Sequence, residues 1–140
     1  MSVCKEKLSM LSEMIAMARI DGAVKMEEYN FLSQIATQLG VTKNTFNSLF
    51  FRDVEKVVPK SKTDRILQFH RLALLMNVGQ EQHDNKLGEL HVMGLGLGLR
   101  PSAILKVISE MDNYPDKQIP RKRLLEIFDA SEVDGQAAKD

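Results

Sequence analysis

The sequence predicts an all-α fold, a bundle of about seven helices within a single domain. Apolar side chains recur at intervals of three and four residues along nearly the whole chain, the spacing that lines one face of a helix. The length of 140 residues is close to the common size of one domain, and 44% hydrophobic residues supply enough apolar surface for one core. We therefore expect a helical domain over residues 1–130, followed by a flexible acidic tail over residues 131–140.

The first three helices follow from this periodicity and from the residues that begin and end helices. Residues 8–18 share a broad apolar face, and Gly22 ends this helix because glycine tolerates the left-handed conformation of a helix end. A second helix is expected over residues 26–40, with acidic side chains in its first turn, where the helix dipole favours them. Thr42 is the expected N-cap of a short third helix that ends near Phe50.

Four further helices are expected in the second half of the chain. Ser61 begins a capping turn before a helix that is apolar on most sides, so this helix is expected to be central. A polar break separates it from the next helix, and prolines suit the first turn of the last two. The expected helices cover residues 66–78, 87–97, 101–108 and 120–128.

One stretch, residues 94–99, alternates glycine and leucine with the period of a strand. The sequence offers no second convincing strand to pair with it, and an isolated strand leaves its backbone hydrogen bonds unmade. We therefore expect a helix end here, at a cost of about 1 kcal/mol for each glycine inside the helix. Gly94 and Gly98 would then lie on one face and allow another helix to approach closely.

The chain also contains an internal repeat with an offset of 58 residues, which relates Leu32 to Leu90. Each copy is a helix, a short polar turn and a second helix that closes with Leu-Gly and an aliphatic residue, at residues 39–41 and 97–99. Two such hairpins are expected to pack as a pseudo-twofold bundle, in which each hairpin buries the apolar face of the other. The alternative is a chance similarity between two amphipathic helix pairs.

Charge, cysteine content and hydropathy argue against several classes of protein for this chain. The 19 Lys and Arg residues balance 19 Asp and Glu residues, which argues against a nucleic-acid binder, since such proteins usually carry a basic surplus. The single cysteine, Cys4, cannot form an internal disulfide and suits a reducing compartment. No apolar stretch approaches the roughly 18 residues of a membrane-spanning helix. We expect a cytoplasmic protein with no membrane partner.

The strongest candidate for a binding site is the turn between the first two helices. Asp21, Glu27 and Glu28 supply the hard oxygen ligands that a divalent cation such as Ca²⁺ takes. Glu81 and Asp84 of the second turn would join them if the two repeats face each other. The predicted metal site therefore contains these five acids, with weak binding and no other cofactor. The alternative interpretation is structural, with the same acids capping the turn and complementing a helix dipole.

No combination of residues indicates an enzyme, and we predict no catalytic residues. His83 and His91 are eight residues apart, about two helical turns, which is too far for a zinc pair on adjacent turns. Cys4 lacks the base and the orienting group that activate a nucleophile. His70 is expected to pack inside the bundle or at an interface.

One motif resembles a known family. Residues 15–28 read IAMARIDGAVKMEE and are followed by Leu-Gly-Val at residues 39–41, a pattern similar to the first motif of TerB-like domains, which include the tellurite-resistance TerB proteins and the N-terminal domain of the DjlA co-chaperones. In the second copy Gly79 replaces the family's aspartate, and Asn85-Lys86 replaces its glutamate pair. The resemblance implies an all-α bundle with an acidic surface, a divalent-ion role and a link to the tellurite or stress response. It implies no settled enzymatic activity.

These features favour a helical interaction module with a protein partner, and a homo-oligomer is compatible with them. Phe50 and Phe51 are consecutive, so both cannot face the same core, and an exposed phenylalanine is a sign of an interface. The alternative function is a small nucleic-acid-binding helical domain that uses residues 42–56 or the basic cluster within residues 117–123.

Overall fold

The computed structural model describes residues 5–78 and 84–129, and within these ranges every regular element is helical. The α-helices are α1 (Lys5–Ala18), α2 (Met26–Gln38), α3 (Lys43–Ser48), α4 (Lys62–Val78), α5 (Asp84–Gly96) and α6 (Pro101–Glu110). Two 3₁₀ turns, η1 (Met111–Asn113) and η2 (Pro115–Lys117), lead to a seventh helix at residues 121–129. The predicted all-α bundle of about seven helices is therefore confirmed, and the predicted tail at residues 131–140 lies outside the described residues.

Among the described residues, none of the helices combines the length and the apolar character needed to cross a membrane.

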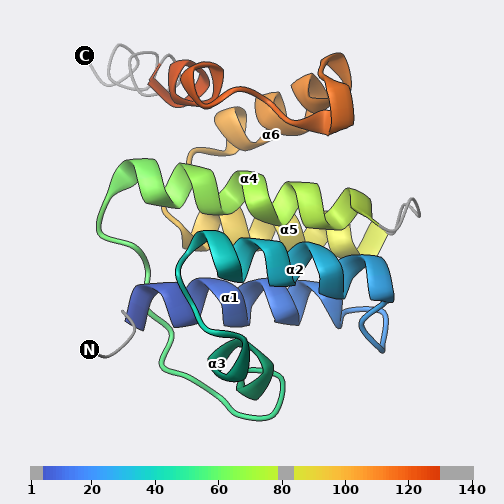
Figure 1. Ribbon diagram of the computed structural model, residues 1–140. Helices are drawn as coiled ribbons and strands as arrows, with labels where there is room; N and C mark the ends of the chain where they lie inside the picture. The colour runs from blue at the N-terminus through green and yellow to red at the C-terminus, as the bar shows by residue number, and fades with distance from the viewer. Residues whose placement is uncertain (1–4, 79–83, 130–140) are drawn as a thin grey trace.

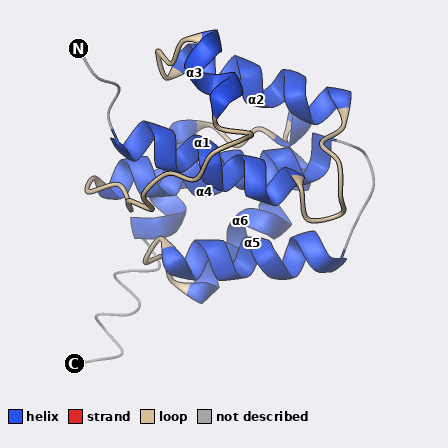
Figure 2. Ribbon diagram, turned by 90° about the horizontal axis from the view of Figure 1, so that it is seen from below, coloured by secondary structure: helices blue, strands red, loops and turns tan. Residues whose placement is uncertain are grey.

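The helices form layers around a central pair (Figures 1 and 2). Helices α1 and α4 lie in the middle, with α2 and α3 on one side and α5 and α6 on the other. Leu11 and Met14 of α1 and Phe69 and Leu72 of α4 are fully buried, so the core is centred on this pair. The predicted central position of the fourth helix is confirmed.

Capping residues set several of the helix boundaries. The Thr42 hydroxyl accepts a hydrogen bond from the Thr45 amide at 3.3 Å, and the Ser61 hydroxyl accepts one from the Asp64 amide at 3.2 Å. Each bond satisfies an amide that the first turn of a helix leaves without an intrahelical partner. Pro101 is the first residue of α6, as expected from its fixed φ angle.

The internal repeat is a repeat of structure. Helices α2 and α5 each have 13 residues, and both their first residues (26 and 84) and their last residues (38 and 96) differ by 58. Gly40 and Gly98 follow these helices with φ angles of 77° and 78°. The next amides, those of Val41 and Leu99, donate to the carbonyls of Ala36 and Gly94 at 2.9 and 3.1 Å. The two halves therefore repeat the helix boundaries and the turn that follows the second helix, as expected for two hairpin repeats.

Two contacts locate the pseudo-twofold axis, because only residues near such an axis touch their own equivalents. The side-chain amide of Gln68 donates to the carbonyl of Met10, its equivalent 58 residues earlier, at 3.0 Å. The ammonium of Lys86 donates to the carboxylate of Glu28, again 58 residues earlier, at 2.8 Å. The axis therefore passes between α1 and α4 and between the first turns of α2 and α5.

The two glycines predicted to share one helix face have different roles. A Cβ atom at Gly94 would lie 2.6 Å from Cδ1 of Ile104 and 3.0 Å from Cε1 of Phe69, so glycine is needed for the close approach of α6 and α4. Gly98 lies beyond the end of α5, where a Cβ atom would meet nothing within 4 Å and the positive φ angle requires glycine. The prediction was right for Gly94 and wrong for Gly98.

The seventh helix is held against the bundle by polar contacts to α4 and α6. The Ile119 amide donates to Nε2 of His70, a buried residue, at 3.3 Å. Burial lowers the pKa of His70 below its usual 6.5; a hydrogen bond with the backbone of Lys117 opposes this shift, and nearby Arg71 adds to it. The guanidinium of Arg123 makes two hydrogen bonds to the Glu110 carboxylate, at 2.6 and 2.8 Å, which hold the pKa of Glu110 below its usual value.

Candidate functional site

The turn between α1 and α2 is the region that the sequence marked as a cation site. Gly22 has a φ angle of 117°, which lets the chain reverse after α1. Glu28, the third residue of α2, is 1% exposed, and its Oε1 accepts a hydrogen bond from the Lys25 amide at 2.9 Å. This bond satisfies the backbone at the start of the helix, which is the structural role that the alternative interpretation gave to the acids.

The other oxygen of Glu28 is bound by a lysine from the second half of the chain. Lys86 is 5% exposed, and its Nζ lies 2.8 Å from Oε2 of Glu28 and 3.9 Å from Oδ2 of Asp21. An opposite charge in direct contact offsets the cost of removing a carboxylate from water. The two acids therefore share one ammonium group.

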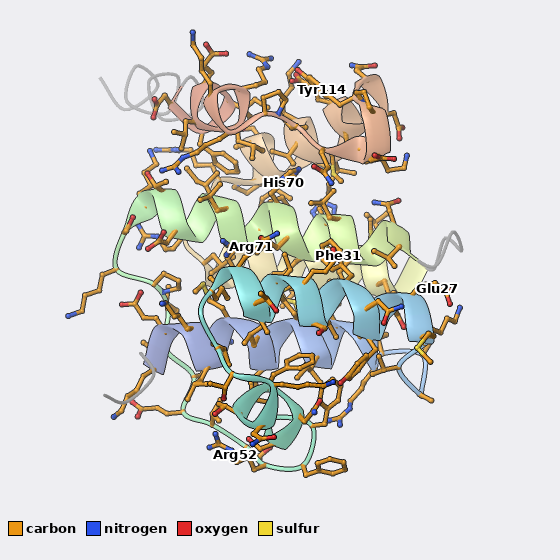
Figure 3. The ribbon with its side chains drawn as sticks, in the orientation of Figure 1. Glu27, Phe31, Arg52, His70, Arg71 and Tyr114 are labelled. Carbon is orange, nitrogen blue, oxygen red and sulfur yellow. The ribbon has the colours of Figure 1, made fainter. Side chains whose placement is uncertain are left out.

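The structure brings together two of the five predicted metal ligands. Asp21 and Glu28 meet at Lys86, whereas Glu27 is exposed at the start of α2 (Figure 3). Glu81 and the side chain of Asp84 lie outside the described part of the structure. Within the described part, no group of three or more His, Cys, Asp or Glu side chains could hold a metal ion.

A second candidate site lies on the outer side of the same turn. It is a groove of about 610 Å³ that we call the α1–α3 groove. Phe51 and Met26, at its edge, are 90% and 68% exposed. The residues that line the groove are Arg19, Ala23, Val24, Met26, Tyr29, Asn47, Phe50 and Phe51.

Packed aromatic rings make the floor of the groove rigid. The ring of Phe46 lies 5.5 Å from that of Tyr29 and 5.3 Å, edge to face, from that of Phe50. The Tyr29 hydroxyl donates to Oδ1 of Asn47 at 2.7 Å. The guanidinium of Arg19 lies 5.5 Å from the centre of the Phe50 ring and donates to the Phe50 carbonyl. These contacts hold Tyr29, Phe50 and Arg19, three of the residues that line the groove, against one another.

The prediction that one of two consecutive phenylalanines is exposed is confirmed. Phe50 packs against the core cluster, and Phe51 extends into solvent just after α3. Arg52 follows at the same end of the molecule (Figure 3), where its Nε donates to the Ser48 hydroxyl at 3.2 Å. Contiguous exposed apolar patches mark contact surfaces, and exposed Phe51 and Met26 both line this groove.

A smaller cavity of about 250 Å³ lies between α1, α5 and the segment after α3. Its lining includes Glu13, Lys56 and Glu89. Burial raises the pKa of Glu13, although Nε2 of Gln68 donates to its carboxylate at 3.2 Å. The chemistry of this cavity is mixed, and its polar groups point to no single class of ligand.

The basic cluster near residue 120 is partly neutralised by acids. Lys117 pairs with Asp112, and Arg123 pairs with both Glu110 and Glu126. A lysine or arginine that already holds a carboxylate releases fewer counterions when it meets a phosphate. These ion pairs weaken the nucleic-acid interpretation of this region.

Sequence reasoning missed Lys86, the residue that organises the acidic turn. Lysine is mostly exposed, so nothing in its local sequence indicates burial. The internal repeat could have indicated this residue, because the offset of 58 relates Lys86 to Glu28. Equivalent residues can touch if they lie near a twofold axis, and these two have opposite charges and form an ion pair.

No protein-family model matches the chain, and no curated protein and no solved structure matches it either.

Proposed function

We propose that this chain is a helical protein-interaction module that docks a short apolar segment of another protein in the α1–α3 groove. The observation that carries the proposal is Phe51, which is 90% exposed beside a floor of packed aromatic rings. Aromatic side chains with few rotatable bonds are ordered on binding at low entropic cost, and they dominate the energetics of many interfaces. Met26, which is 68% exposed, adds a pliable apolar contact to the groove.

The lining of the groove indicates the chemistry of the partner. Arg19 is the one charged side chain among the eight residues that line it, and no acid is among them. An acidic side chain next to an apolar anchor would therefore complement the groove, with its carboxylate near the guanidinium and its anchor against Phe50 and Phe51. The proposed occupant is a partner segment that carries an aliphatic or aromatic anchor flanked by Asp or Glu.

Other parts of the functional hypothesis rest on the sequence alone. The TerB-like assignment, the cytoplasmic location, the link to a tellurite or stress response and the absence of enzymatic activity stay predictions. The groove supports only the interaction role, because it offers an apolar surface and one cation rather than reactive groups.

Selection from a random peptide library on the immobilised chain tests the proposal. We expect enriched peptides to combine an apolar anchor with a nearby acid. Their affinity should fall at least about tenfold, which is about 1.4 kcal/mol, in Phe51→Ser and also in Arg19→Gln. Leu105→Ser and Arg121→Gln are matched controls, since they change exposed residues of the same kind on α6 and on the seventh helix.

The same variants distinguish a peptide partner from other occupants of the groove, such as a second copy of the chain or a nucleic acid. No enrichment, or an equal loss in the control variants, would contradict a docking role for the groove. A dimer in sedimentation experiments that dissociates in Phe51→Ser would show that a second copy of the chain is the occupant. Retardation of nucleic acid at low salt, lost in Arg19→Gln or Arg52→Gln, would support the nucleic-acid alternative instead.

A further inference from the structure

Each oxygen of the Glu28 carboxylate already accepts a hydrogen bond. Oε1 accepts from the Lys25 amide at 2.9 Å, and Oε2 accepts from Nζ of Lys86 at 2.8 Å. The same ammonium lies 3.9 Å from Oδ2 of Asp21. A single positive charge is therefore already placed between the two acids that the sequence marked as cation ligands.

We infer that the ammonium of Lys86 takes the place of a divalent cation at the α1–α2 turn, so the folded turn needs no metal. Ca²⁺ binds six to eight oxygens at about 2.3–2.6 Å, and the described residues place only two carboxylates here. A cation at that distance from Oε2 would also lie next to a buried ammonium, and like charges repel strongly away from water. The residues present fit an ion pair and do not fit a metal site.

The internal repeat explains why the residue at position 86 decides between an ion pair and a metal site at this turn. Glu28 and Lys86 are the third residues of α2 and α5, and the pseudo-twofold axis brings these equivalent positions into contact. A symmetric sequence would place a second glutamate at position 86. Two buried carboxylates would then face each other, and at neutral pH they would need a shared cation or a shared proton. Lysine at position 86 supplies the cation covalently and links the two halves of the chain.

Calorimetric titration with Ca²⁺ and thermal unfolding with Ca²⁺ or with EDTA test this inference. The wild-type chain should give no binding heat, and its unfolding temperature should be the same in both conditions. Lys86→Glu should gain Ca²⁺ binding, and its unfolding temperature should rise when Ca²⁺ is added. Lys106→Glu, which makes the same charge change at an exposed position on α6, should gain neither.

Two further variants keep the test decisive when Lys86→Glu fails to fold without metal. Lys86→Gln places an amide oxygen where the ammonium was and leaves Glu28 without its counter-ion, so Ca²⁺ should stabilise this variant. Glu28→Gln combined with Lys86→Gln should remove that effect. Two results would overturn the inference: Ca²⁺ binding by the wild-type chain that Glu28→Gln abolishes, or no more Ca²⁺ response in the Lys86 variants than in Lys106→Glu.

Discussion

The Glu13 carboxylate is a charged group in an environment that favours its neutral form. It lies in α1 beside the small cavity, and burial raises its pKa. The Glu13 carboxylate therefore binds a proton more tightly in the folded protein than in the unfolded chain. The resulting stabilisation is present at low pH and is lost as the pH rises from the unfolded pKa of about 4.5 through the higher pKa of the folded state.

We predict that Glu13→Gln increases the free energy of unfolding at neutral pH. The amide removes the buried charge and keeps an oxygen that accepts the hydrogen bond from Nε2 of Gln68. Urea denaturation at several pH values measures the effect, and the difference from wild type should shrink as the pH falls toward about 4. Glu6→Gln on the same helix is the control. An equal gain at low and neutral pH would show that the charge is not the cause.

At the scale of single residues, the sequence could predict the acids of the α1–α2 turn but not their partner. Asp21 and Glu28 stand out because carboxylates gather around a turn with a glycine. Their role depends on Lys86, which is close to Glu28 only because the two hairpins pack about a twofold axis. Phe51 could be predicted as one of two candidates, and the packing of α3 then decides that Phe50 is the buried one.

Two of the three glycines of helix α5, Gly88 and Gly94, lie in contrasting surroundings and test how closely the helix packs. Gly94→Ala places a methyl group 2.6 Å from Cδ1 of Ile104, and we expect overpacking to outweigh the gain in helix propensity, for a net loss of about 1 kcal/mol. Gly88→Ala meets nothing within 4 Å and should stabilise the protein by about 0.5–1 kcal/mol. Chemical denaturation measures both changes.

The same packing predicts a non-additive pair of substitutions. Ile104→Val removes the Cδ1 atom that a Cβ atom at Gly94 would approach most closely. The loss of stability caused by Gly94→Ala should therefore be smaller in the Ile104→Val background than in wild type. Additive effects would show that the contact with Phe69, rather than the contact with Ile104, sets the limit.

Docking of the seventh helix is expected to depend on pH through His70. Burial lowers the pKa of this histidine, and its Nε2 accepts the Ile119 amide only while it carries no proton. The unfolded chain therefore binds the proton more readily, so stability is lost as the pH falls below the unfolded pKa of about 6.5. Hydrogen exchange should show earlier loss of protection in residues 121–129 than in α1 at mildly acidic pH.

His70→Gln is the matched variant for this pH effect. The glutamine side chain keeps an acceptor for the Ile119 amide and does not titrate, so stability should change less between about pH 7 and pH 5. Glu110 acts at lower pH, because its contribution is lost only as the pH falls through its depressed pKa. An unchanged pH profile in His70→Gln would contradict the role given to the histidine.

At the scale of elements, helices with local signals were predictable and the connection before the last helix was not. Thr42, Ser61 and Pro101 each determine a boundary through their own side chains or φ angles. By contrast, Asp116 and Lys117 have φ angles of 54° and 61°. Glycine usually occupies positions with a positive φ angle, so nothing in the sequence marks this turn. The turn is closed by a local ion pair instead, between Lys117 and Asp112, five residues apart.

At the scale of the whole molecule, the pseudo-twofold axis relates the fold to the candidate sites. Helices α1 to α3 and α4 to α6 repeat the same path, yet the two copies differ in the residues at the axis and on the outer surface. Asn47 of the α1–α3 groove corresponds to Leu105, and Phe50 corresponds to Ile108. The second half therefore lacks the aromatic floor, which explains why one copy carries the candidate docking groove.

The ion pair across this axis should couple the two halves energetically. Glu28→Gln keeps an acceptor for the Lys25 amide but leaves Lys86 buried without its nearest counter-ion. Lys86→Met has the converse effect on Glu28. Breaking a buried pair from one side costs about 3–5 kcal/mol, so each single variant should lose stability in this range. The double variant should lose much less than the sum, because it leaves neither charge unpaired.

A double-mutant cycle by chemical denaturation measures this coupling. The control cycle uses Lys5 and Glu55, an exposed pair at 3.2 Å, for which coupling of about 0.2–1 kcal/mol is expected. Additive losses at Glu28 and Lys86 would mean that Asp21, 3.9 Å from the ammonium, compensates for Glu28 on its own. Strong coupling would mean that the two hairpins, although repeats of one path, are held in register by the pair of equivalent residues in which they differ in charge.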